Sequence, residues 1–248
     1  LFERVVLLIV NNSIPFTPEQ PAFMKDLLFV LPFLLLCKNA DAQSCASFYL
    51  LQNNKTIQVA VYSNKGNANG TILYKSSVQP AKGNSITATL HTTLLDKEGK
   101  PLNKGVSNVK CSSGTLLMDM NLFLPQQQTE QFNRAHAKVK NAFLEYPAVL
   151  QTGDHLKDGA FNMEIDNNGV KQILKMQILN REVTGAEKVS TKAGVWDCMT
   201  ITYQVKLNIQ TGPINIPLNF DATEWFAPGF GIVRTESEAG STEIVAIN

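Results

Sequence analysis

Histidine, cysteine and clustered charge are scarce in this chain of 248 residues. The histidines, His91, His136 and His155, and the four cysteines form no H-x-x-x-H or C-x-x-C pair, so the sequence predicts no metal site and no cofactor. It contains no G-x-S-x-G, phosphate-binding loop or dinucleotide motif, which argues against the enzymes that use them. Lysine and arginine (22) nearly balance aspartate and glutamate (21). Without a basic cluster, nucleic acid is not an expected partner.

Long hydrophobic runs are also missing, with one exception near the start. In "MKDLLFVLPFLLLCKNADAQ", a lysine precedes an apolar run, Leu27 to Leu36, that only Pro32 interrupts, and Ala40-Asp41-Ala42 follows. A charged start, an apolar core and an A-x-A site are the parts of a secretory signal peptide. About ten apolar residues are too few for a membrane-spanning helix, which needs about twenty. We therefore predict a signal peptide over residues 24–42 and export to the periplasm, the outer membrane or the medium.

The rest of the chain, residues 43–248, has the length of a single domain. Residues 1–23 precede a better initiator, Met24, and we interpret them as an upstream segment outside the native protein. Two alternatives stay open for the leader: a buried core helix, or lipidation at Cys37 or Cys45 instead of cleavage before Gln43. We expect no transmembrane helix in the mature chain, and the oligomeric state stays open.

Alternation of hydrophobic and polar residues dominates the mature chain, which is typical of half-buried strands. The clearest run, "VWDCMTITYQVKLNI", places Met199, Ile201, Tyr203, Val205, Leu207 and Ile209 on one face and Trp196, Cys198 and Thr200 on the other. Shorter runs occupy residues 57–61, 86–94, 161–165, 174–178 and 214–220. Turn sequences such as "DKEGK" and "DNNG" separate them. Because short turns join antiparallel strands, we predict a mainly β fold with antiparallel pairing.

One stretch, "PQQQTEQFNRAHAKVKNAF" at 125–143, breaks this alternation. It begins with a proline and spaces Phe132, His136, Val139 and Phe143 at helical intervals. We predict one short helix packed on the sheet, with a helix that gives way to a strand near Val139 as the alternative.

Candidate reactive groups are few. Asp197 and Cys198 are adjacent on a predicted strand, so their side chains point to opposite faces and cannot pair as base and nucleophile. His155 with Asp154 and Asp158 forms a cluster of titratable groups, which a solvated turn explains more simply. We therefore predict no catalytic residue and no enzyme. A hydrolase that uses Cys198, or His155 with Asp154, is kept as an alternative.

The mature cysteines are Cys45, Cys111 and Cys198, and export allows a disulfide among three alternative pairings. Cys45 lies near the mature N-terminus, and Cys111 follows a candidate strand. We predict the Cys45–Cys111 pairing, which would tether a loose terminus to the sheet. Cys198 would then be a small packing residue.

Two C-terminal stretches, "AGVWDCMTITY" (193–203) and "EWFAPGFGIVRTES" (224–237), carry a family resemblance. Together with Cys45, "KGNANGTILYK" (65–75) and "DKEGK" (96–100), they resemble the TapB family of exported bacterial proteins, which is related to the DUF3108-like group. The resemblance covers the chain from about Cys45 to the C-terminus. Its motif residues are Gly194, Trp196, Asp197, Cys198, Tyr203, Glu224, Trp225, Phe226, Gly229 and Gly231. The family usually has phenylalanine where this sequence has Trp196.

The motif residues themselves indicate a structural unit. Two strands would meet, Pro228 and Gly229 would form a type II turn, and "GFGIVRTES" would return as a third strand. Trp196, Phe226 and Phe230 are expected to cluster where these strands meet. This arrangement is a packing unit and contains no catalytic site.

The resemblance implies a curved antiparallel sheet, an open or half barrel, with a helix against it and no cofactor. We expect a non-catalytic periplasmic or envelope binding protein, whose concave face contacts a lipid, another hydrophobic ligand or an envelope protein. The alternative is a structural or assembly component of the envelope that holds no small ligand.

Overall fold

The structure, a computed structural model, describes residues 45–80, 85–124, 138–139, 143–167 and 170–248. The chain divides into two units, Leu1–Ala40 and Asp41–Asn248, and every described residue lies in the second. The predicted upstream segment and signal peptide, and residues 125–137 of the predicted helix, lie outside the described residues.

Strands make up most of the described chain, which confirms the mainly β prediction. They are β1 (Thr56–Tyr62), β2 (Ala68–Val78), β3 (Ser85–Leu95), β4 (Pro101–Ser112), β5 (Thr115–Asp119), β6 (Lys138–Val139), β7 (Phe143–Tyr146), β8 (Gly159–Asn167), β9 (Val170–Thr191), β10 (Gly194–Thr211), β11 (Ile214–Ala227), β12 (Gly231–Ser237) and β13 (Gly240–Ile247). Three short 3-10 turns, η2 (Cys45–Ser47), η3 (Tyr49–Leu51) and η4 (Met120–Phe123), are the helical elements of the described residues. Val139 lies in β6, as in the alternative in which the predicted helix gives way to a strand.

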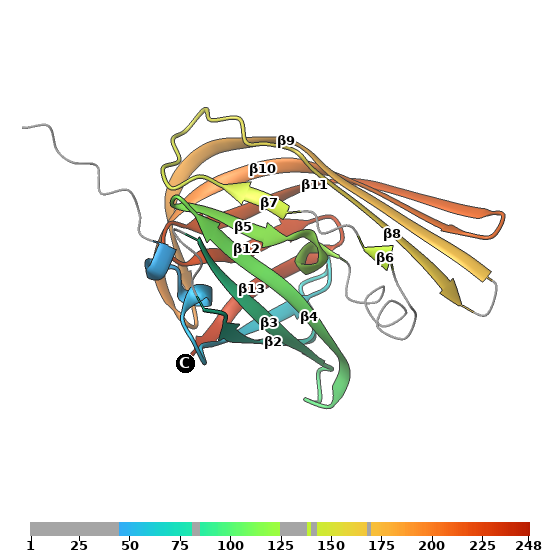
Figure 1. The fold of residues 1–248 in the computed structure, drawn as a ribbon, viewed down its shortest axis with the longest axis horizontal. Helices are drawn as coiled ribbons and strands as arrows, with labels where there is room; N and C mark the ends of the chain where they lie inside the picture. The colour runs from blue at the N-terminus through green and yellow to red at the C-terminus, as the bar shows by residue number, and fades with distance from the viewer. Residues whose placement is uncertain (1–44, 81–84, 125–137, 140–142, 168–169) are drawn as a thin grey trace, which may run out of the picture. The chain divides into compact units, whose positions relative to one another are not determined.

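All described strands belong to one sheet in the order β6-β8-β9-β10-β11-β12-β13-β1-β2-β3-β4-β5-β7. Neighbouring strands pair antiparallel throughout. The sheet curls until it is nearly closed into a barrel (Figure 1). Most strands therefore have an inner face, which lines the interior of the curl, and an outer face.

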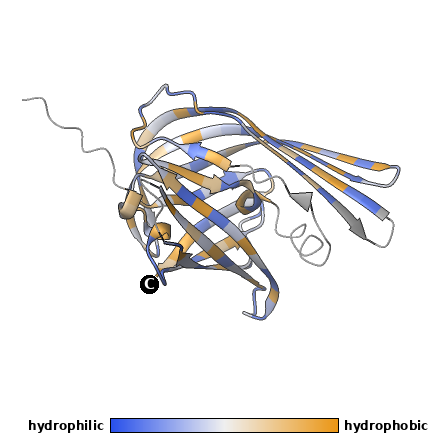
Figure 2. Cartoon of the chain, in the orientation of Figure 1, coloured by the Kyte–Doolittle hydropathy of each residue, from blue (hydrophilic) through white to orange (hydrophobic). Residues whose placement is uncertain are grey.

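Strands β8 to β11 extend well beyond the rest of the sheet (Figure 1). Hydrophobic and hydrophilic residues alternate along this extension (Figure 2). Sequence alternation placed Ile214, Ile216 and Leu218 together on one face, but their exposed fractions are 61%, 48% and 44%. The reason is that β11 pairs with β12 only over residues 222–227, so its first half is an uncovered edge of the extension.

A change of register in the middle of β9 decides which of its residues point inward. Leu174, Met176 and Ile178 are buried at alternate positions, but the next buried residue is Arg181. Asn180 between them has a positive φ of 55°, and the pairing of β9 with β10 shifts register between Thr202 and Gln204. A bulge of this kind moves the following side chains to the opposite face. It turns Arg181 into the protein interior.

The N-terminal 3-10 turns close one part of the interior. Phe48, Leu50 and Leu51 are buried in the main hydrophobic cluster. Cys45 forms a disulfide with Cys111 on β4, with 5.5 Å between their Cα atoms. The tether and the buried side chains together hold the start of the described chain against the sheet.

Candidate functional site

The interior of the curled sheet contains a cavity of about 370 Å³. Its hydrophobic wall comes from several strands and from η4, and includes Ile57, Val59, Ile72, Val205, Leu207, Phe220, Leu122 and Phe123. Most of these side chains occupy alternate strand positions, so the period-two pattern that builds the core also builds the cavity. Volumes above about 300 Å³ are typical of small-molecule sites.

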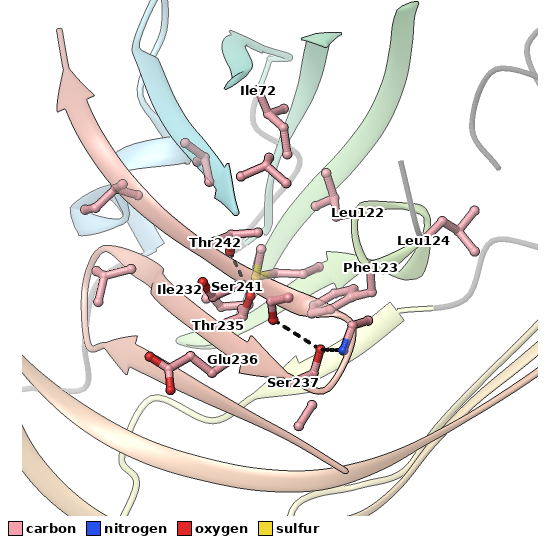
Figure 3. Close-up of a pocket in the computed structure, with 18 of the residues that line it drawn as sticks. Ile72, Leu122, Phe123, Leu124, Ile232, Thr235, Glu236, Ser237, Ser241 and Thr242 are labelled. Carbon is pink, nitrogen blue, oxygen red and sulfur yellow. Dashed lines mark hydrogen bonds between the residues drawn. The ribbon is translucent and has the colours of Figure 1, made fainter. Parts of the chain in front are cut away.

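Hydroxyl groups gather on the part of the wall formed by β12 and β13. Thr235 and Thr242 are register partners on these strands, and their Oγ1 atoms are 2.7 Å apart. Ser237 lies two residues further and donates to the Gly240 carbonyl at 3.3 Å. Figure 3 shows these hydroxyls on one side of the pocket and Leu122, Phe123 and Leu124 on another. The wall is therefore amphipathic, with its polar groups confined mainly to the hairpin.

Two tyrosines also line the cavity, Tyr74 from β2 and Tyr203 from β10. Burial raises the pKa of Tyr74 to about 12. Burial, and then the neighbouring Glu224, raise the pKa of Tyr203 well above its ordinary value. Both phenols stay neutral at physiological pH and can donate a hydrogen bond.

A fully buried ion pair, between Arg181 on β9 and Glu224 on β11, lies next to Tyr203. Arg181 Nη2 is 3.6 Å from Glu224 Oε1, and both side chains have zero exposure. Arg181 Nη1 also donates to the carbonyls of Glu145, at 3.1 Å, and Lys157, at 3.0 Å. Glu145 belongs to β7, at one end of the sheet, whereas Arg181 and Glu224 belong to β9 and β11. Arg181 therefore links elements that no backbone ladder joins.

Aromatic side chains complete this link. The guanidinium of Arg181 lies 4.7 Å from the centre of the Tyr146 ring. Tyr146 in turn stacks on Phe226, with 4.6 Å between ring centres and an interplanar angle of 8°. Because Tyr146 is on β7 and Phe226 on β11, this stack packs one end of the sheet against its middle.

Several polar atoms of this cluster have no hydrogen-bond partner of normal geometry among the described residues. They are both carboxylate oxygens of Glu224, Nε and Nη2 of Arg181, and the hydroxyl of Tyr146. The Tyr146 and Tyr203 hydroxyls approach the carboxylate closely enough to favour its charged form. Burial nevertheless outweighs them and Arg181, and raises the pKa of Glu224 above its ordinary value.

The C-terminal motif residues form the predicted turn and a divided aromatic cluster. Gly229 has a φ of +80°, and the Phe230 N–H donates to the Ala227 carbonyl at 3.0 Å. Trp196 packs on Phe230 with 4.2 Å between ring centres. Phe226 contacts Tyr146 instead of joining them. Sequence reasoning missed this partner because β7 lies far away in the chain.

Of the remaining motif residues, Gly231 lines the cavity, and Asp197 and Trp225 make polar contacts outside it. Asp197 accepts a hydrogen bond from Lys188 Nζ at 2.6 Å, and both are exposed. Trp225 Nε1 donates to the Glu187 carboxylate at 2.6 Å. Gly194 and Gly231 have φ angles of +150° and +130°, in the region that favours glycine. These residues position strands and carry no reactive pair.

Cys198 is a free thiol with 2% exposure, although the alternation placed it on the face away from the core. It belongs to the main hydrophobic cluster, which also contains Phe230 and against which Trp196 packs. Burial, then Asp197 and Glu187, raise the pKa of the thiol to about 11. Its hydrogen bond goes to the Trp196 carbonyl at 3.8 Å. Such surroundings disfavour the thiolate that nucleophilic catalysis needs.

The histidine cluster of the sequence analysis is part of a loop that pairs with β9. His155 forms an isolated bridge with Glu182. The Asp154 carboxylate accepts the Gln151 N–H at 2.7 Å, and the Asp158 carboxylate accepts the Asn180 N–H at 2.9 Å. Asp154 therefore stabilises a turn of its own loop, and Asp158 joins that loop to the β9 bulge at Asn180. No group of three histidine, cysteine or acidic side chains suited to a metal occurs within the described part of the chain.

The chain belongs to the DUF3108-like family, whose sequence model matches residues 52–246. No curated protein matches it in a sequence comparison. The chain is similar to the structure of a Bacteroides fragilis protein that is proposed to be exported and has a YmcC-like fold. The TM-score is 0.64 and the identity 22%, over 79% of this chain and 96% of the other. The structure of a proposed lipoprotein from Parabacteroides distasonis is also similar, with a TM-score of 0.66 and 19% identity. The similarity covers 82% of this chain and 98% of the other. No helix among the described residues is long and apolar enough to cross a membrane.

Proposed function

We propose that this protein is exported, has no catalytic activity and binds a hydrophobic ligand inside its curled sheet. The observation that carries the proposal is the cavity of about 370 Å³ with a largely hydrophobic wall. An interior packed solid by its own side chains would leave no room for such a ligand. Empty apolar space is unfavourable in a folded protein, so a site of this size is more stable when filled.

Export rests on three observations. The leader has the pattern of a signal peptide, and the Cys45–Cys111 disulfide suits an oxidising compartment. The two structurally similar proteins are a proposed exported protein and a proposed lipoprotein. We expect alkaline phosphatase fused after residue 248 to be active in cells only when residues 24–42 are present. The finer assignment to the TapB branch stays part of this proposal.

Ligand binding is tested with N-phenylnaphthylamine, an uncharged dye that fluoresces in apolar sites. We expect saturable binding that Ala222→Phe abolishes, because Ala222 lines the cavity and the larger side chain would fill it. Val205→Phe, on the neighbouring strand, is a second filling variant. Ala60→Phe is the matched control, since Ala60 alternates with the cavity residues Val59 and Val61 and points outward.

Circular dichroism and urea unfolding show whether each variant is folded. Dye binding that never saturates, or that is equally strong in both folded filling variants, would refute the proposed site. Native mass spectrometry of protein purified from its own envelope then identifies the mass of any ligand that copurifies.

A structural role in envelope assembly is the second candidate. It is favoured by Ile214, Ile216 and Leu218, which are exposed along the uncovered edge of β11. Exposed strand edges can add a strand from a partner. Loss of an envelope pull-down partner in Ile216→Lys, with dye binding retained, would support this candidate.

A further inference from the structure

The charges around the cavity restrict the chemistry of its ligand. No lysine, arginine or histidine occurs among the described residues that line it. The acidic residue Glu236 lies between Thr235 and Ser237, so its side chain belongs to the outer face of β12 and is exposed. A ligand carboxylate or phosphate inside the cavity would therefore lose its hydration without gaining a counter-charge.

The hydroxyl pair on the hairpin can satisfy an uncharged polar group. Thr235 and Thr242 hold each other at 2.7 Å, and this bond uses the proton of only one hydroxyl. The pair keeps a second proton and free lone pairs, so it can both donate to and accept from a ligand. Alcohols and esters match this combination.

The buried ion pair beside the hairpin also leaves no charge free for an ionic ligand. Glu224 is the register partner of Thr235, so the two side chains lie side by side on the inner face. Its carboxylate lacks a hydrogen bond of normal geometry from any described residue. Arg181 already pairs with this carboxylate at 3.6 Å, so a ligand carboxylate that hydrogen-bonds to Thr235 would stand beside Glu224 and find no unmatched positive charge, and a ligand cation would find no unmatched negative charge.

We propose that the ligand is an uncharged amphiphile: a single hydrocarbon chain with a hydroxyl or ester head that hydrogen-bonds to the Thr235–Thr242 pair. The chain would lie against the hydrophobic wall formed by residues such as Ile72, Val205 and Phe220. This inference rests on the proposed function, because it names the class of molecule that the cavity accepts.

The first experiment compares heads on one chain length by displacement of N-phenylnaphthylamine at pH 8. Dodecanoylglycerol and dodecanol are uncharged, dodecanoate is an anion and dodecylamine is a cation. We expect the two uncharged molecules to have a Kd at least about tenfold lower than the two ions, a difference that the loss of a desolvated charge readily exceeds. If dodecanoate or dodecylamine binds as tightly as the glycerol ester, the inference is overturned.

The second experiment locates the head. Thr235→Val with Thr242→Val keeps the shape of both side chains but removes the hydroxyls. We expect the Kd of dodecanoylglycerol, divided by that of the dye, to rise about fivefold or more, as the loss of one or two hydrogen bonds implies. Thr223→Val is the control, because Thr223 alternates with the buried Ala222 and Glu224 and faces outward.

The outcomes separate the two proposals. Dye that fails to bind at all refutes the proposed function. Dye that binds and is displaced best by dodecanoate leaves the proposed function standing and overturns the uncharged ligand. An unchanged ratio in the double valine variant, with the uncharged molecules still preferred, would overturn the assignment of the head to the hydroxyl pair.

Discussion

The buried Arg181–Glu224 pair provides a sharp test of how this sheet is closed. In Arg181→Met, a side chain of similar volume replaces the guanidinium, and three polar interactions disappear together with the contact of the guanidinium with the Tyr146 ring. Glu224 loses its ion partner at 3.6 Å, and the carbonyls of Glu145 and Lys157 lose the donor that holds them at 3.1 and 3.0 Å. Because the remaining carboxylate has zero exposure, water cannot replace these contacts.

Removal of one partner from a buried pair costs about 3–5 kcal/mol. With a urea m-value of about 2 kcal/mol/M, the midpoint of unfolding should fall by roughly 1.5–2.5 M. The control is Arg234→Met, which breaks the pair with Glu243, where the side chains keep 27% and 21% of their exposure. A partly solvated pair of this kind contributes about 1 kcal/mol or less.

The cost should also depend on pH in a defined direction. Burial raises the pKa of Glu224, so the native state binds this proton more tightly than the unfolded state. The contribution of Glu224 is therefore most favourable below its unfolded pKa of about 4.3 and is lost as the pH rises through the raised folded value. Without Arg181 the pKa should rise further, so Arg181→Met should be less destabilising at pH 5 than at pH 8.

The double variant Arg181→Met with Glu224→Gln completes the cycle. Glutamine at position 224 does not titrate, so the pH dependence of the cost of Arg181→Met should disappear. Part of the free energy of unfolding that Arg181→Met removed should also return. Tryptophan fluorescence in urea, with the disulfide kept oxidised, measures each variant. The reasoning fails if Arg181→Met costs no more than Arg234→Met, or if its cost is the same at both pH values.

Two further predictions concern the cysteines. Replacement of Cys45 and Cys111 by serine removes a crosslink across 66 residues, which the chain-entropy relation makes worth about 4 kcal/mol. The melting temperature should therefore fall while the strand content in circular dichroism is kept. An unchanged melting temperature would refute this. The pKa of Cys198 is raised to about 11, so this thiol should resist iodoacetamide at pH 8 in the folded protein and react after unfolding. Mass spectrometry of the peptide that contains Cys198 measures the labelling. Rapid labelling of the native protein would show that the thiol is accessible.

Local alternation predicted the strands well because it records which face of each strand is buried. The run from Ile214 to Phe220, continued for three more alternate positions, also puts Ala222, Glu224 and Phe226 on the inner face, where all three are buried. Glu224 could therefore have been recognised from sequence as an acidic residue in a core position. Its partner could not, because the bulge at Asn180 reverses the alternation just before Arg181.

The cavity itself was not predictable from periodicity. Alternation shows that a side chain points inward, but how far apart two inner faces lie depends on the number of strands and their curvature. The same limit applies to Cys198, which alternation placed outside and which lies buried in the hydrophobic cluster. It also applies to Ile214, which alternation placed inside and the short pairing with β12 exposes. Burial in a curled sheet depends on neighbours that are distant in the chain.

Closure of the sheet and the existence of the cavity are connected. Backbone ladders join neighbouring strands from β6 to β7, but no ladder among the described residues joins the two ends of that series. Side chains of Arg181, Glu224, Tyr146 and Phe226 instead pack β7 against β9 and β11, and backbone hydrogen bonds join the loop after β7 to β9. A side-chain contact can bridge a wider gap than a hydrogen-bonded ladder, which keeps neighbours within about 5 Å. The sheet can therefore enclose more volume than its inner side chains fill, and the N-terminal residues Phe48, Leu50 and Leu51 occupy only part of it.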